Sequence, residues 1–293
     1  MLAFTKVFFA LYLVSSAFAV ATNMVRDSAA SLQVDASSKT PVFTVPTLTQ
    51  IRDILGQIQP PIISALAERY KLGFNPELYA NGAQPLRDFL KPRENVAKAS
   101  GRYAYGKLEY PFIIPAVVKP DVTSKTNTFP PGRFHQDSYS GNPDLFAFYI
   151  TTIVPLFTSP KPTFFHLDNS TVNNDAALNL DATILDLLSH RSSIGKVVAE
   201  SKFAADVASF TSLIQARNTT QIRVLLTNTT QEATVLTGAT NAASAFTTAW
   251  TSSGALDSPT YASDFSNIAF TTFRRLIDIT TDIEVQYLLE RFH

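Results

Sequence analysis

The sequence predicts an all-α fold, a single helical bundle-like domain with one long loop insertion. Apolar residues recur at spacings of three and four along most of the chain, which is the period of an amphipathic helix. No segment alternates polar and apolar residues as a half-buried strand does. Of the 293 residues, 45% are apolar and none is cysteine, so we expect one large core without disulfides.

The first 45 residues are expected to precede the domain. Residues 1–21 have the features of a secretory signal peptide, with a charged start at Lys6, an apolar stretch and small residues at 17–21. The apolar stretch is too short for a membrane anchor. Residues 22–45 lack periodicity and are expected to form a mobile leader. The helical domain is therefore expected to occupy residues 46–293.

The first helix is expected to begin at Thr47, a residue type that caps helices, and Pro60-Pro61 should kink or split it. A stretch rich in small residues, 237–260, is expected to be a weak helix or a loop. The other helices expected from the apolar spacing cover residues 84–103, 145–157, 175–190, 193–216, 220–235 and 263–292.

Residues 105–142 contain five prolines, together with Gly132 and Gly141, and are expected to form a long loop. The loop insertion itself runs from Lys119 to Asn142. Its aromatic set, suited to binding another protein, is Phe129, Phe134, His135 and Tyr139. The alternative is an insertion that the surface merely tolerates.

Composition excludes several classes of function. The 24 basic and 24 acidic residues give no net charge, which argues against nucleic acid and acidic membrane surfaces as partners. Without cysteine there are no thiolate metal sites and no cysteine nucleophile. The four histidines show no metal-ligand spacing, and the glycine-rich nucleotide motifs are absent, so we expect no metal and no cofactor.

Two cations, Arg191 and Lys202, lie eleven residues apart in the run HRSSIGKVVAESKF. On one helix this separation is almost three turns, which places both on one face about 16 Å apart. Gly195 and Val198 lie between them, as expected for a buried wall. Because buried cations need an anion and none is adjacent in sequence, we expect a dianionic ligand.

Further polar residues fall on apolar faces of predicted helices. They are Arg52 beside Ile51 and Leu55, Asn228 and Glu232 in line with Leu225, and Thr280 and Glu284 in a stripe with Phe273, Ile277 and Leu288. Each alone would be explained by a rim charge or a satisfied core group. Together they indicate one ligand site formed by several helices, because each buried charge costs several kcal/mol unless it is paired. An internal salt-bridge network is the competing interpretation, and the charges disfavour a carrier of apolar ligands.

Four segments, TLTQIRDIL, IGKVVAESKF, TNTTQEATVL and ITTDIEVQYLLERF, resemble the eukaryotic all-helical chorismate mutase family. The similarity spans the chain from about Thr47 to its end. With the signal peptide, the chain resembles the secreted chorismate mutases of plant-associated smut fungi. The resemblance implies conversion of chorismate to prephenate without a cofactor, a homodimer, and secretion with the host cytoplasm as one destination.

Seven polar residues match the family's substrate-binding residues in order and register: Arg52, Arg191, Lys202, Asn228, Glu232, Thr280 and Glu284. The resemblance implies that Arg52 and Arg191 hold the two carboxylates of chorismate. It further implies that Lys202 contacts a carboxylate and the ether oxygen, which Glu284 also faces.

By the same resemblance, Asn228 and Glu232 lie near the ring hydroxyl, whose hydrogen bond Glu232 accepts, and Thr280 lies near the ring carboxylate. Asn228 also begins one of three glycosylation motifs, with Asn169 and Asn218. A glycan on Asn228 would fill the site, so we expect this residue to be unmodified.

The chain departs from the regulated members of that family at two places. Arg102-Tyr103 stands where they carry paired arginines, and Asp175-Ala176 replaces a Gly-Ser effector contact. We therefore expect no feedback by tyrosine or tryptophan, unless other contacts retain it. An alternative function is a secreted interaction protein on the same scaffold, which binds a host protein through the loop of residues 119–142 with catalysis secondary.

Overall fold

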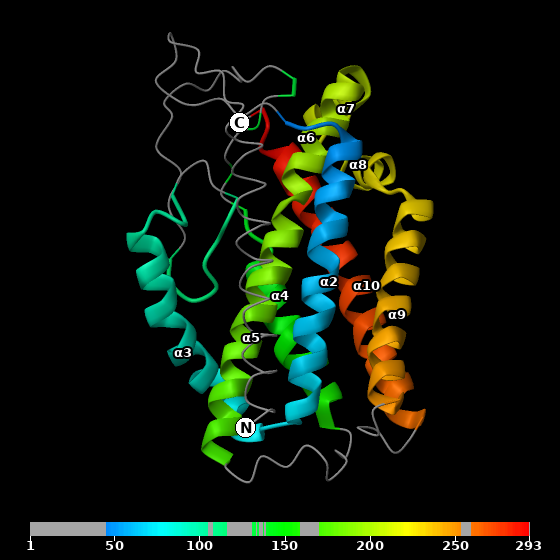
Figure 1. The fold of residues 1–293 in the computed structure, drawn as a ribbon. Helices are drawn as coiled ribbons and strands as arrows, with labels where there is room; N and C mark the ends of the chain where they lie inside the picture. The colour runs from blue at the N-terminus through cyan, green and yellow to red at the C-terminus, as the bar shows by residue number, and fades with distance from the viewer. Residues whose placement is uncertain are drawn as a thin grey trace.

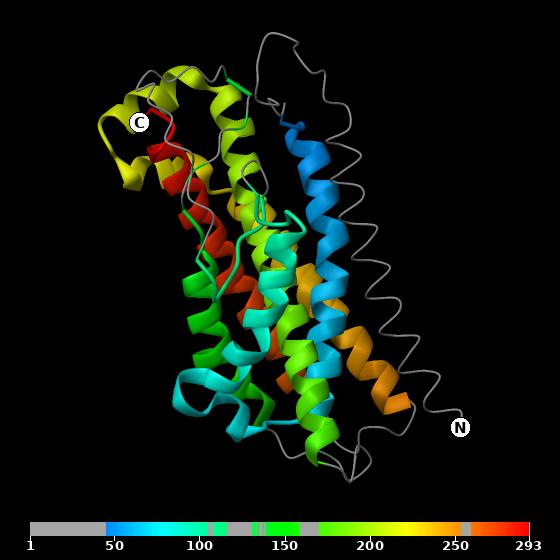
Figure 2. The same cartoon turned by 90° about the vertical axis from the view of Figure 1, so that its left-hand side faces the viewer.

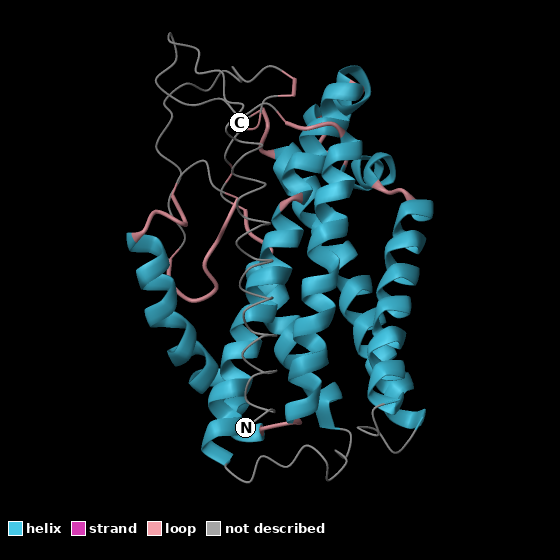
Figure 3. Cartoon of the chain, viewed as in Figure 1, coloured by secondary structure: helices cyan, strands magenta, loops and turns pink. Residues whose placement is uncertain are grey.

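The computed structural model describes residues 45–104, 108–115, 131–132, 134, 137, 139–158, 170–252 and 259–292. These residues form helices and connecting loops without a strand (Figure 3), which confirms the all-α prediction. The predicted signal peptide, the leader up to residue 44 and residues 119–130 of the loop insertion lie outside the described residues.

The elements, in chain order, are α2 (Leu48–Leu72), η1 (Pro76–Tyr79), α3 (Ala80–Ala99), α4 (Asn142–Phe148), η2 (Tyr149–Ile153), η3 (Val154–Thr158), α5 (Ser170–Ser193), α6 (Gly195–Ala205), α7 (Val207–Gln215), α8 (Thr219–Leu226), α9 (Thr229–Ser252) and α10 (Pro259–Leu289). Long helices α2, α5, α9 and α10 form an elongated bundle, and α6 extends α5 (Figure 1). Figure 2 shows α3 on the outer side of α5. No helix among the described residues is both long and apolar enough to cross a membrane.

Helix α2 starts where the sequence predicts. The Gln50 N–H donates to Thr47 Oγ1 at 3.4 Å, and the Thr47 N–H donates to Gln50 Oε1 at 3.0 Å, which forms a capping box. Pro60 and Pro61 lie inside one continuous helix, so the chain is not split there. Each proline lacks the N–H that would bond a carbonyl four residues earlier. Those earlier residues, 56 and 57, are exposed, so water can bond the released carbonyls.

Several predicted boundaries are wrong. Helix α3 is bounded by Ala80 and Ala99, but residues 81–83 have left-handed dihedral angles, so its right-handed part begins at residue 84 as predicted and ends four residues before the predicted end. Asp206 (φ −145°, ψ 67°) separates α6 from α7 and caps α7 by accepting from the Ser209 N–H at 3.2 Å. The predicted helix 220–235 is divided in the same way by Asn228, which caps α9. The stretch that begins at residue 237 is helical as far as Ser252.

The described part of the loop insertion is packed against the inner face of α6. Lys196 donates to the Asp137 carboxylate, to Tyr110 Oη at 2.6 Å and to the Tyr139 carbonyl at 2.6 Å. One turn later, Glu200 accepts from the Gly132 N–H at 2.9 Å. Tyr110 and Asp137 are buried and Gly132 and Tyr139 are partly buried, so this part of the loop packs against the core.

Candidate active site

A cavity of about 640 Å³ lies between α2, α9 and α10, with the junction of α5 and α6 as its inner wall. This volume is in the range of small-molecule sites. Much of its lining is apolar, from residues such as Ile51, Val198 and Ile277. All seven residues predicted from the sequence line this one cavity: Arg52, Arg191, Lys202, Asn228, Glu232, Thr280 and Glu284.

The α5–α6 junction lies unusually close to α10 because residue 195 is glycine. A Cβ atom at Gly195 would lie 2.8 Å from Thr280 Cγ2 and 3.1 Å from the Thr280 carbonyl oxygen. Ile194 separates the two helices, close to the break expected between residues 190 and 193, so Arg191 and Lys202 lie on different helices and not on one. Its dihedral angles (φ −61°, ψ −21°) remain helical, so α6 continues in nearly the direction of α5 and both cations still reach the cavity.

Arg191 is a buried cation without a protein anion. Only 4% of the residue is exposed, and its Nε atom has no hydrogen-bond partner. The guanidinium carbon lies 5.4 Å from the centre of the Phe273 ring, and the described residues provide no carboxylate for it. Burial lowers the pKa of Arg191 to about 10, which still leaves the side chain charged at neutral pH. An unpaired buried charge is costly, so this site favours an anion from solution.

Lys202 and Glu284 form an ion pair beside Arg191. The Lys202 ammonium donates to the Leu226 carbonyl and lies 3.4 Å from Glu284 Oε2. Glu284 is 6% exposed, and burial raises its pKa from 4.5 to about 7, although Lys202 acts in the opposite direction. Near neutral pH a large share of the molecules therefore carry a protonated Glu284 that can donate a hydrogen bond.

The other four predicted residues surround this pair. Thr280 Oγ1 donates to the Leu276 carbonyl at 2.6 Å, and Asn228 Oδ1 accepts from the Gln231 N–H at 2.9 Å. Glu232 lies 3.4 Å from Arg274. The expectation that Arg52 and Asn228 lie on buried faces is wrong, because both line the open side of the cavity and are exposed.

A purely structural salt-bridge network would pair every charge, and this cavity does not. Lys202 and Glu284 are paired, and Glu232 is paired with Arg274. Arg52 and Arg191, in contrast, form no ion pair within the described residues. Two arginines without protein partners in a cavity of this size are suited to a small molecule with two negative groups.

Two side chains at this site were missed from the sequence. Gln59, two turns from Arg52 on α2, lines the cavity, and its Nε2 atom lies 3.5 Å from the Val235 carbonyl. Arg274 contacts Glu232 from α10. The charged residues Arg274, Asp278 and Asp282 recur every fourth position, which indicates an exposed stripe, but no pattern in the sequence reveals a partner on α9. Within the described part of the chain, no group of histidine and acidic side chains could hold a metal ion.

Comparison with known proteins shows similarity to chorismate mutases in sequence and in fold. No family model matches the chain. The chorismate mutase of Trichoderma parareesei is 30% identical over 190 residues, which cover 61% of this chain and 69% of that protein. Among solved structures, the chloroplast chorismate mutase of Zea mays superposes with a TM-score of 0.63 at 24% identity and covers 84% of this chain and 96% of its own. The chorismate mutase of Candida albicans, in complex with L-Trp, superposes with a TM-score of 0.58 at 22% identity and covers 83% of this chain and 91% of its own. The two structures share the fold of this chain.

Proposed function

We propose that this chain, which belongs to the eukaryotic chorismate mutase family, converts chorismate to prephenate. The observation that carries the proposal is Arg191, a buried cation without a protein anion, in one cavity with Lys202 and Glu284. The reaction is an intramolecular rearrangement in which one C–O bond breaks and one C–C bond forms. It needs no nucleophile, and catalysis consists of holding the substrate and stabilising charge.

Substrate binding is assigned to the two unpaired arginines. Arg191, fixed in the inner wall, would hold one carboxylate, and the exposed Arg52 would hold the second from the open side. Guanidinium groups bind carboxylates in a bidentate geometry, so this pair can fold the enolpyruvyl arm over the ring. Restricting the substrate to that conformer removes an entropic part of the barrier.

Charge stabilisation is assigned to Lys202 and protonated Glu284. Negative charge grows on the ether oxygen as the C–O bond breaks, and both side chains can donate to it. Lys202 is held in place by the Leu226 carbonyl, so little reorganisation is needed. Removal of one preorganised donor of this kind typically costs about 3 kcal/mol, or 100-fold or more in rate.

The protonation of Glu284 predicts the pH dependence. Because Glu284 donates only when it is protonated, and its pKa is raised to about 7, kcat should fall as pH rises through this value. Glu284→Gln provides a donor that does not titrate, so its kcat should stay nearly constant from about pH 6 to pH 8. Initial rates of chorismate consumption across this range measure the effect.

Glu68→Gln is the matched control, because Glu68 pairs with Lys71 and does not line the cavity. Its pH profile should follow that of the unaltered protein. If Glu284→Gln keeps the decline above pH 7, Glu284 is not the titrating donor.

We include in the proposal that aromatic amino acids do not regulate the enzyme. The contacts of Arg102 support this part of the proposal. Arg102 pairs with Glu109 and lies 3.3 Å from Asp186, so two carboxylates already neutralise the cation. An amino-acid effector would have to displace them to bind its own carboxylate. The predicted result is that saturating L-tyrosine or L-tryptophan leaves the rate and the substrate dependence of chorismate consumption unchanged. A clear change in either curve would refute it.

The proposal also includes secretion and a homodimer. Asn218 and Asn228 are both exposed, and each caps a helix through its side-chain oxygen. When the protein is recovered from the culture medium of the organism that produces it, we expect an N-terminus near residue 22 and an unmodified Asn228. Peptide mass spectrometry measures both, and a fully glycosylated Asn228 would contradict the assignment of this residue to the site.

The activity itself is tested by mixing the purified chain with chorismate and following its disappearance and the formation of prephenate. The matched variant Arg191→Ala should be folded and nearly inactive. Consumption at the uncatalysed rate by the unaltered protein would overturn the proposed function.

A further inference from the structure

Helices α8 and α9 meet at a corner that carries three groups of the cavity. We define the α8–α9 corner as residues 223–234. It supplies the Leu226 carbonyl, which holds Lys202, and the side chains of Asn228 and Glu232. Within the corner only Leu226 is buried, whereas Gln231 and Glu232 are partly buried and the rest are exposed. Apolar packing therefore holds this corner weakly, although three site contacts depend on its position.

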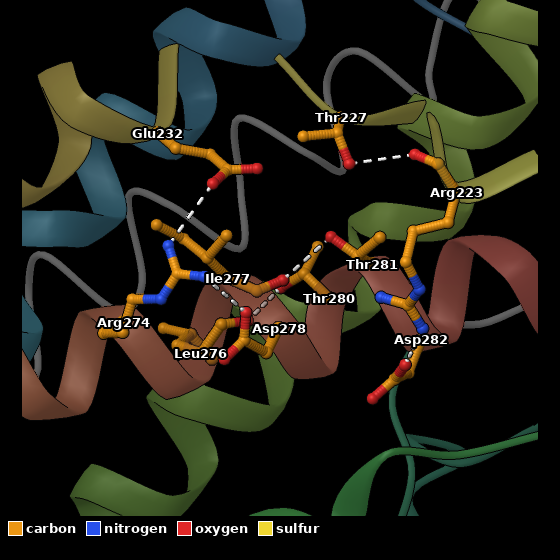
Figure 4. A network of polar contacts seen from close by, with 10 residues as sticks. All are labelled: Arg223, Thr227, Glu232, Arg274, Leu276, Ile277, Asp278, Thr280, Thr281 and Asp282. Carbon is orange, nitrogen blue, oxygen red and sulfur yellow. Dashed lines mark hydrogen bonds and ion pairs between the residues drawn. The ribbon is translucent and has the colours of Figure 1, made fainter. Parts of the chain in front are cut away.

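Two ion pairs join the corner to α10, one on each side of the bend. Before the bend, Arg223 pairs with Asp282. After it, Glu232 lies 3.4 Å from Arg274, which is itself 3.2 Å from Asp278 on its own helix. Figure 4 shows both arginines extended between the helices, with Thr227 at the bend bonded back to the Arg223 carbonyl.

We infer that Arg223 and Arg274 are positioning residues. Their ion pairs with Asp282 and Glu232, which we call the clasp, fix the α8–α9 corner to α10. The clasp thereby holds the Leu226 carbonyl at Lys202, and Asn228 and Glu232 at the substrate. The inference rests on the proposed function for its effect on catalysis. Neither Arg223 nor Arg274 lines the cavity.

The exposure of these pairs determines what their loss should do. Arg223 and Arg274 side chains are 45% and 49% exposed, and ion pairs of this kind contribute little to global stability because water and salt screen them. A weakly packed segment can open locally without unfolding the protein. Loss of the clasp should therefore loosen the corner and impair the site while the fold persists.

Arg223 also acts on Glu284 by its charge. The charged groups that face Glu284 are Lys202 from α6, Glu232 from α9 and Arg223 from α8, while Arg191 and Arg52 line the same cavity from α5 and α2. Lys202 and Arg223 lower the pKa of Glu284, and Glu232 raises it. Removal of Arg223 should therefore shift the decline of kcat to higher pH, which a merely structural role would not do.

The experiment compares Arg223→Ala, Arg274→Ala and the double variant with Arg87→Ala, an arginine that stacks on Phe146 away from the cavity. Amide hydrogen exchange of peptides that cover residues 223–234 reports on the corner without reference to activity. We expect faster exchange there in the double variant, a kcat/KM about tenfold lower and an unchanged Tm. Arg223→Asp combined with Asp282→Arg should restore the exchange rate and most of the activity.

The two proposals fail in different ways. If the unaltered protein and Arg87→Ala do not consume chorismate, the proposed function is wrong, and exchange alone then decides whether the clasp exists. If chorismate is consumed normally, unchanged exchange in residues 223–234 overturns the clasp. Faster exchange with unchanged kcat/KM would overturn the positioning role.

Discussion

Replacement of Arg191 by methionine is expected to lower kcat/KM for chorismate by about 100-fold or more while the free energy of unfolding stays the same or rises by about 1–3 kcal/mol. Arg191 has no hydrogen-bond partner on its Nε atom and no carboxylate beside it. Its guanidinium therefore bears a desolvation cost that nothing in the described residues offsets. Methionine removes this cost and keeps the apolar contact with Phe273.

Arg69→Met is the matched control, because Arg69 is equally buried but fully paired. Its guanidinium donates to Asp181 at 2.7 Å, to the Gly73 carbonyl at 2.5 Å and to Tyr79 at 2.6 Å. Removal of this partner should cost about 3–5 kcal/mol, because Asp181 would be left buried with its charge unpaired by a cation. Urea unfolding measures both variants. If Arg191→Met loses stability as Arg69→Met does, Arg191 belongs to a structural network and not to an anion site.

Replacement of Lys196 by methionine is expected to lower the free energy of unfolding by about 3–5 kcal/mol. The loss leaves Asp137, which is 2% exposed, as an uncompensated charge between α6 and the loop. It also removes the donor to the Tyr139 carbonyl, so Asp137 and Tyr139 both lose their attachment to α6. The same helix carries Lys202 on its other side, so we expect a loss of activity that follows the loss of folded protein.

The double variant Lys196→Met, Asp137→Leu separates the ion pair from the packing. With both charges removed, most of the lost stability should return, because a buried ion pair and a well-packed apolar pair are often nearly equivalent. Urea unfolding of the two single variants and the double variant gives the coupling energy. A cost below about 1 kcal/mol for Lys196→Met would show that the loop is not held by this pair.

The fold class could be predicted from the sequence, because apolar spacing is a local pattern that predicts the helices. Polar residues on apolar helix faces, with the family resemblance, predicted seven residues that line one cavity, and their roles at the substrate stay predictions. The breaks at Asp206 and Asn228 could not be placed from spacing, since the apolar period continues across them. Asp206 and Asn228 are nevertheless good capping residues, so their side chains were a usable signal.

The sequence could not predict which charged side chains are exposed or which of them form ion pairs. Arg52 follows Ile51, and Arg191 lies three residues from both Leu188 and Ile194, yet Arg52 is exposed and Arg191 is buried. The difference arises from what packs against each helix, which is a tertiary property. The same holds for Arg274, whose partner Glu232 lies 42 residues away on a different helix. Long-range pairs of this kind leave no period in either segment.

The most direct test of the anion site is a crystal structure with a bound dicarboxylate analogue of the transition state. One carboxylate should contact the Arg191 guanidinium, the second should contact Arg52, and the ether-type oxygen should lie within hydrogen-bond distance of Lys202 and Glu284. An analogue that binds elsewhere, or that occupies the cavity without contacting Arg191, would contradict the proposed site.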